Sequence, residues 1–107
     1  MFAKANHTPF QEVVRGIEKR TLVFGEKTLM TEFRLHKGST LPSHAHPHEQ
    51  TGYLVSGRMQ LTIGDQTYDI ATGDSWCIPG DTVHSAVCLE DAVAVEVFSP
   101  LREDYLP

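Results

Sequence analysis

Glycine and proline recur along the sequence at intervals that leave little room for a helix. Between Pro9 and Gly80, no stretch free of both residue types is longer than 12 residues. An average helix in a globular protein needs about 11 to 12 residues, and glycine or proline inside it lowers its stability. The pattern is typical of short strands joined by turns, and the interruptions fall at Gly16, Gly25, Gly38, Pro42, Pro47, Gly52, Gly57, Gly64, Gly73, Pro79 and Gly80.

Between these interruptions, apolar residues alternate with polar ones, as they do in strands that bury one face. Residues 29–35, 59–63 and 93–97 have this two-residue period. Gly64 and Asp65 separate two such runs, and a pair of this type closes a tight β-hairpin. A short chain of many strands must close or pack its sheets to cover their edges. The sequence therefore predicts an all-β sandwich or barrel.

Length and charge limit the possible functions. With 107 residues and a mass of 11.9 kDa, the chain has room for one domain, residues 1–107. A net charge of -5 has the wrong sign for a phosphate backbone or an anionic membrane surface, so neither a nucleic-acid nor a membrane partner is expected. The first ten residues lack the basic start and apolar stretch of a secretory signal, and the expected location is cytoplasmic. Cys77 and Cys88 lie in apolar stretches and are expected to be reduced, small hydrophobic residues.

A cluster of histidines carries the clearest chemical signal. His44, His46 and His48 fall within five residues. Side chains two residues apart on an extended segment point the same way, so a pair or a triplet of imidazoles converges. Neutral imidazole is the commonest protein ligand for transition metals, and His84, after the turn at Pro79, is the expected distant partner. The alternatives are a solvated polar loop for the cluster and a hydrogen-bonded core histidine for His84.

The spacing around the histidines resembles the first sequence motif of the cupin superfamily, here residues 38–57. That motif consists of a glycine, two histidines, a carboxylate and a closing glycine, at the places held here by Gly38, His44, His46, Gln50 and Gly57. Gln50 thus stands where the family usually has glutamate.

Residues 73–88 resemble the second cupin motif in Gly73, Pro79 and His84. Asp81 and Cys88 stand where the family has glycine and asparagine. The resemblance implies a cupin-type double-stranded β-helix, which is a small jelly-roll barrel. It also implies a divalent metal ion inside the barrel mouth, with the ligands His44, His46, Gln50 and His84.

A narrower resemblance covers most of the chain. Residues 47–53 and 96–105 are similar to those of the cupins of pectin and alginate breakdown, which linearise unsaturated uronate monosaccharides. In those proteins the tail supplies an aspartate, a phenylalanine and an arginine to the site. Phe98 and Arg102 match, and Glu96 stands for the aspartate. The resemblance implies opening of a 4,5-unsaturated ring toward a 5-keto acid, with Glu96, Phe98 and Arg102 as catalytic residues.

The amide of Gln50 favours the same chemistry on physical grounds. Three imidazoles and one amide are neutral, so a dipositive ion would keep its charge and favour an anionic ligand. These donors suit Ni, Zn, Mn and Fe ions alike. Many dioxygenases hold iron with two histidines and a carboxylate, but Glu49 lies at odd separation from His46 and would point away. A Lewis-acid metal with a carboxylate that moves protons is therefore favoured over redox chemistry.

The tail residues can be placed by the same two-residue period. Glu96 and Phe98 share one strand face, so Glu96 faces the interior if Phe98 does, and burial or a cation would then shift its pKa. A solvent-facing Glu96 is the alternative. Arg102 would bind a substrate carboxylate or lie in solvent. Trp76 and Tyr53 are expected to be aromatic residues of the core or the pocket wall.

The sequence therefore predicts a metal-dependent cupin that acts on a small sugar acid. Two other functions stay open: a non-enzymatic cupin that binds a sugar or effector through its metal, and, less favoured, a metal-dependent dioxygenase. Residues 13–24 leave strand edges that a second copy would cover, which predicts a homodimer. The expected partners are this second copy and a small anionic substrate or ligand.

Overall fold

The computed structural model describes residues 1–107, and its regular elements are strands and one short 3-10 turn. The turn is η1 (Glu103–Tyr105). The prediction of an all-β chain is confirmed, and the chain forms no helix long and apolar enough to cross a membrane. The strands are β1 (Gln11–Val14), β2 (Ile17–Phe24), β3 (Leu29–Leu35), β4 (Thr40–His44), β5 (Glu49–Ile63), β6 (Gln66–Ala71), β7 (Ser75–Ile78) and β8 (His84–Ser99).

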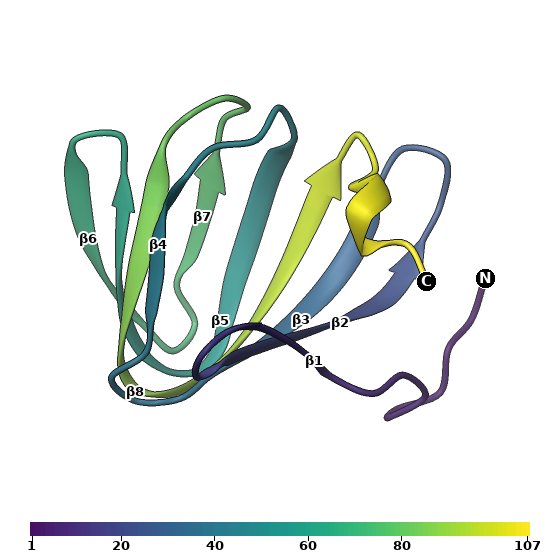
Figure 1. The fold of residues 1–107 in the computed structure, drawn as a ribbon, viewed down its shortest axis with the longest axis horizontal. Coiled ribbons are helices and arrows are strands. Elements are labelled where there is room, and N and C mark those ends of the chain that lie inside the picture. The colour runs from purple at the N-terminus through teal and green to yellow at the C-terminus, as the bar shows by residue number, and fades with distance from the viewer.

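The two longest strands, β5 and β8, form the centre of the fold and pair antiparallel over most of their length. Each also takes two further partners. β8 pairs with β4 near its start and with β3 near its end, while β5 pairs with β7 and then with β6. β2 and β1 continue the sheet beyond β3. Figure 1 shows β4, β6 and β7 on one side and β2 and β3 on the other, so the long strands carry the sheet around an interior.

β5 bends at Gly57. The register between β5 and β8 shifts around this residue, between Leu54 and Met59. Gly57 has a φ of +96°, a left-handed conformation that residues with a side chain rarely adopt. A Cβ at this position would also lie 2.3 Å from the carbonyl oxygen of Asp91. The closing glycine of the first motif therefore allows the two long strands to bend against each other.

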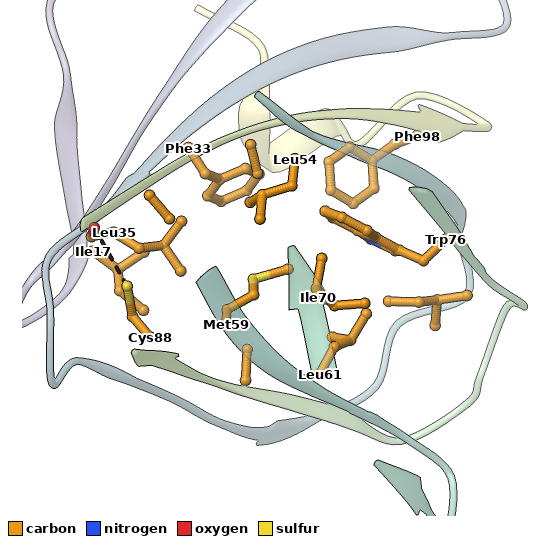
Figure 2. Close-up of a cluster of buried hydrophobic side chains, with 14 of the residues drawn as sticks. Ile17, Phe33, Leu35, Leu54, Met59, Leu61, Ile70, Trp76, Cys88 and Phe98 are labelled. Atoms are coloured by element: carbon orange, nitrogen blue, oxygen red, sulfur yellow. Dashed lines mark hydrogen bonds between the residues drawn. The ribbon is translucent and has the colours of Figure 1, made fainter. Parts of the chain in front are cut away.

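The inward-facing side chains form one apolar core. Every second residue of β3 is buried, as the alternation predicts. The predicted hairpin is also present, with Ile63 and Gln66 paired on either side of the turn. Figure 2 shows the core side chains converging from facing strands, with Trp76 and Phe98 toward one end of the cluster in this view. Gln50 and His84 lie on β5 and β8, which also contribute core side chains.

Two expectations about single residues are wrong. Tyr53 is 50% exposed and does not line the core or a pocket wall, because β5 turns Gln50 and Gly52 inward and Tyr53 outward. Cys77 is exposed because it lies between the inward-facing Trp76 and Ile78. Cys88 is buried, and both cysteines are free, as expected.

Candidate metal centre

Strand ends bring the four predicted ligands into one region. His44 ends β4 and pairs with His84, the first residue of β8. His46 lies in the connection after β4, and Gln50 lies at the start of β5. One ring nitrogen from each of the three histidines lies within 4.8 Å of the other two. The pairing of β4 with β8 therefore unites histidines that are far apart in the sequence.

Backbone carbonyls orient all three rings. Nδ1 of each ring lies near a carbonyl oxygen two residues away, at 2.8 Å for His44 and His84 and at 3.1 Å for His46. Because a carbonyl only accepts, Nδ1 holds the proton and Nε2 of the neutral ring keeps its lone pair. Burial lowers the pKa of His46 and of His84, which favours the neutral ring. Metal-binding histidines commonly donate their second nitrogen to a carbonyl in this way.

The Nε2 atoms of His84 and His46 both lack a hydrogen-bond donor, whose place a cation could take. Nε2 of His84 is buried and has no hydrogen-bond partner. Nε2 of His46 lies 3.0 Å from Oε1 of Gln50, so in the neutral ring two lone pairs face each other. Two ligand atoms that each lie about 2.1 Å from one metal ion, at right angles, are themselves about 3.0 Å apart. The three histidines and Gln50 therefore fit a divalent transition metal ion.

His48 does not join this group. β4 ends at His44, and the backbone beyond it is no longer a strand, so the two-residue period stops. His48 is not among the residues whose ligand atoms lie within 4.8 Å of one another, and its carbonyl oxygen is the one that accepts from Nδ1 of His46. Of the predicted pair or triplet, only His44 and His46 converge.

A buried carboxylate lies directly behind Gln50. Oε2 of Glu96 accepts a hydrogen bond of 2.6 Å from Nε2 of Gln50, and Oε1 accepts one of 3.1 Å from Nε1 of Trp76. The amide of Gln50 thus turns its NH₂ toward Glu96 and its oxygen toward His46. Burial raises the pKa of Glu96 to about 7, although the two hydrogen bonds act in the opposite direction. Glu96 faces the interior together with Phe98, as their two-residue separation predicts.

The other two tail residues lie next to this group. The ring of Phe98 is buried, 5.7 Å from that of His46. The guanidinium of Arg102 lies 5.2 Å from the centroid of Phe98 and 4.0 Å from that of Tyr105. Asp104 accepts from Nε and Nη2 of Arg102, at 3.3 and 2.9 Å. These contacts hold the guanidinium of Arg102 in place, and only 15% of the side chain is exposed to solvent.

A cavity of about 290 Å³ connects these residues. Its polar lining includes His44, Gln50, His84, Glu96 and Arg102. Much of the remaining lining is apolar and comes from the N-terminal strands and the core, at Val13, Val14, Ile17, Phe33, Leu35, Leu41, Met59 and Leu61. The cavity can therefore take a small ligand whose charged groups meet the histidines and Arg102. A carboxylate able to exchange a proton lies in the same wall.

Sequence reasoning misses two contacts of this site. It assigns Trp76 to the core or pocket wall, without the hydrogen bond to Glu96. A buried indole N–H usually has a hydrogen-bond partner, so a buried Trp76 itself indicates such a bond. It also misses Asp104 as the partner of Arg102, although opposite charges two residues apart are visible in the sequence.

Comparison with known proteins finds relatives over nearly the whole chain. The chain is 28% identical over 103 residues to the pectin degradation protein KdgF of Dickeya dadantii (strain 3937), which covers 94% of each protein. The structure is similar to that of KdgF from a Halomonas species, with a TM-score of 0.92, 28% identity and coverage of 99% and 98% of the two chains. An RmlC-like cupin from Shewanella frigidimarina NCIMB 400 gives a TM-score of 0.92 at 28% identity, with coverage of 98% and 95%.

The family described as Cupin domain matches residues 31–99. This range is well over half of the chain, and it contains the three histidines, Gln50, Glu96 and Phe98 but not Arg102. On this match, and on the shared fold of its relatives, the chain belongs to the cupin family.

Proposed function

We propose that the chain is a metal-dependent cupin enzyme that acts on a small sugar acid. Its whole length, residues 1–107, serves as one cupin domain. His44, His46, Gln50 and His84 would hold a divalent transition metal ion, and Ni, Zn, Mn and Fe ions all suit these donors. When bound, the ion would supply a Lewis acid that orients an anionic substrate.

The observation that carries the proposal is the buried carboxylate of Glu96. It touches the expected ligand Gln50 and lines the same cavity as His84 and Arg102. A carboxylate that is buried without an ion-pair partner costs stability, and such groups are concentrated at catalytic sites. Orienting Gln50 needs only a hydrogen-bond acceptor, whereas a carboxylate whose pKa burial raises to about 7 can also exchange a proton.

The proposed reaction is the linearisation of a 4,5-unsaturated uronate. Opening of the hemiacetal ring gives an enol, and tautomerisation moves one proton from the enol oxygen to carbon 4 and leaves a 5-keto acid. Glu96 would transfer this proton from the cavity wall, and the ring of Phe98 would form part of that wall. Two of the relatives are named KdgF, one of them as a pectin degradation protein, and these names support a substrate of this class.

Arg102 would bind the carboxylate of the substrate. Asp104 accepts from the Nε–H and from one N–H of Nη2, which leaves the Nη1 group and the second N–H of Nη2 for a ligand. Stacking on Tyr105 and Phe98 holds the guanidinium at the cavity. A charge-assisted hydrogen bond there would select for acids.

A non-enzymatic binding cupin is the second candidate. The apolar part of the cavity lining favours it for an effector less polar than a sugar, because the hydroxyl groups of a sugar need hydrogen-bond partners that these side chains do not offer. In this alternative the metal anchors a ligand and Glu96 transfers no proton.

We also propose that the chain forms a homodimer. β1 is an edge strand that pairs only with β2. The outer faces of β3 and β5 expose Met30, Tyr53 and Val55. A second copy would cover unpaired backbone groups and apolar surface together.

The test of the reaction follows the ultraviolet absorbance of a 4,5-unsaturated galacturonate or mannuronate produced by lyase digestion. Metal-loaded protein should remove this absorbance faster than spontaneous decay does. Glu96→Gln should lose this acceleration. Its matched control is Glu49→Gln, which should match the wild type because Glu49 adjoins Gln50 but is exposed. No acceleration by the wild type would reject the uronate substrate and favour the binding cupin.

A further inference from the structure

Three inward-facing residues lie in a row across three neighbouring strands. Gly52 of β5 pairs with Trp76 of β7 on one side and with Glu96 of β8 on the other. All three are buried. Neighbouring strands lie about 4.8 Å apart, so β7 and β8 are about 10 Å apart across β5. Only a long side chain that passes over the middle strand can join the outer two.

Gly52 allows the indole of Trp76 to make this passage. A Cβ at Gly52 would lie 2.2 Å from Cε2, 2.3 Å from Cζ2 and 2.4 Å from Nε1 of the indole. The backbone of Gly52 is not left-handed, so its conformation alone would accept other residues. What requires glycine here is the ring that lies over it.

The passage brings a fixed hydrogen-bond donor to Glu96. The indole N–H can only donate, and the rigid ring sets its direction. It donates to Oε1 of Glu96 and thereby leaves Oε2 for the NH₂ of Gln50. The two ends of an amide have nearly the same shape, so packing alone does not decide which end of Gln50 faces the metal ligands. Glu96 decides it, because its Oε2 lies 2.6 Å from Nε2 of Gln50 and accepts a hydrogen bond from that NH₂ group.

We propose that Trp76, passing over Gly52, is a positioning residue for the metal centre. It fixes the carboxylate of Glu96, which in turn keeps the oxygen of Gln50 directed at the metal ion. The inference rests on the proposed ligand role of Gln50, and it holds for whichever substrate the protein takes.

The test is the affinity of the full chain for Co²⁺, measured by competition with a chelator. Trp76→Phe removes the N–H and keeps an aromatic ring, so Glu96 loses one of its two donors. The Kd for Co²⁺ should rise, by up to about the tenfold that loss of a ligand's direct partner commonly causes. Gly52→Ala should act in the same direction because it displaces the indole. Gly25→Ala is the matched control, since a Cβ at Gly25 would meet nothing within 4 Å and its backbone is not left-handed. It should leave the Kd unchanged.

A double-mutant cycle separates positioning from core filling. In a Gln50→Ala background the amide is absent, so Trp76→Phe should cause no further loss of Co²⁺ affinity. A residue that only fills the core would lower the affinity equally in both backgrounds. That result, or a Trp76→Phe variant with the wild-type Kd, would overturn the inference.

The hydrogen bond can also be observed directly, because Trp76 is the only tryptophan of the chain. Its indole N–H gives one resonance in a proton–nitrogen NMR spectrum, and Glu96→Ala should shift it upfield. An unshifted resonance would contradict the contact. If the Co²⁺ affinities change as expected but the wild type does not turn over a uronate, the proposed reaction is rejected and the role of Trp76 stands. If the wild type turns over the uronate but Trp76→Phe keeps the wild-type Kd for Co²⁺, the role of Trp76 is rejected and the proposed reaction stands.

Discussion

Replacement of Glu96 by glutamine should weaken metal binding as well as stop turnover. The amide is nearly isosteric with the acid, which by itself would suggest an undisturbed metal site. Glu96, however, accepts one hydrogen bond at each oxygen, from Trp76 and from Gln50. Glutamine offers one oxygen and one NH₂ group, so two donors would meet a single acceptor.

The metal-free variant can resolve this conflict if Gln50 rotates its amide. The new NH₂ at position 96 then donates to the oxygen of Gln50, and the NH₂ of Gln50 donates to the lone pair of His46. Metal binding has to reverse the rotation and leave a buried donor without an acceptor, at about 1 to 3 kcal/mol. Since about 1.4 kcal/mol is a factor of ten, the Kd for the metal should rise about 5- to 150-fold.

Chelator competition with Co²⁺ gives this Kd, and the uronate assay at saturating metal gives the turnover. Exchange of both residues, Gln50→Glu with Glu96→Gln, restores one donor for each acceptor and should recover the affinity but not the turnover. A wild-type Kd in Glu96→Gln alone would refute the argument that Glu96 orients Gln50. Wild-type turnover in that variant would remove Glu96 from the proton transfer.

Three further results are expected. His46→Ala should abolish metal binding; a ligand at about 100 times its Kd stabilises the fold by about 2.7 kcal/mol, so a chelator should lower the melting temperature of the wild type and leave that of the variant unchanged. Arg102→Ala should raise KM with a smaller effect on kcat, because the guanidinium contacts the substrate carboxylate in both the ground and the transition state. A lower kcat with an unchanged KM would contradict this role. Light scattering at micromolar concentration should give twice the chain mass of 11.9 kDa, and the mass of a single chain would reject the dimer.

Much of the fold could be predicted because the two-residue period of a strand decides which of its side chains face the core. The alternation in residues 29–35 predicts which side chains of β3 are buried, and the same rule turns Glu96 inward with Phe98. The rule would also have turned Tyr53 outward if it had been counted from Gln50, since the two are separated by an odd number of residues. An aromatic side chain favours burial by its type, but at Tyr53 the outward strand face overrides that preference.

The contacts that complete the site depend on register between distant strands. Trp76 reaches Glu96 only because β7 and β8 both pair with β5 at Gly52, and no local pattern specifies two registers at once. The end of β4 at His44 likewise decides that His48 leaves the cluster. Such facts depend on strand pairing, which the two-residue period does not encode.

The amide at position 50 and the carboxylate at position 96 are chemically linked. A glutamate at position 50, as in the usual cupin motif, would face Glu96 across the 2.6 Å now spanned by an N–H···O hydrogen bond. Two buried carboxylates at that distance cannot both stay ionised, so one would hold a proton or move away. An amide offers an oxygen to one side and a donor to the other. The residue that leaves the charge of a bound cation uncompensated is therefore also the residue that allows a carboxylate to lie directly behind the ligand. An anionic substrate can then meet a cation and a proton-transfer group in one small cavity.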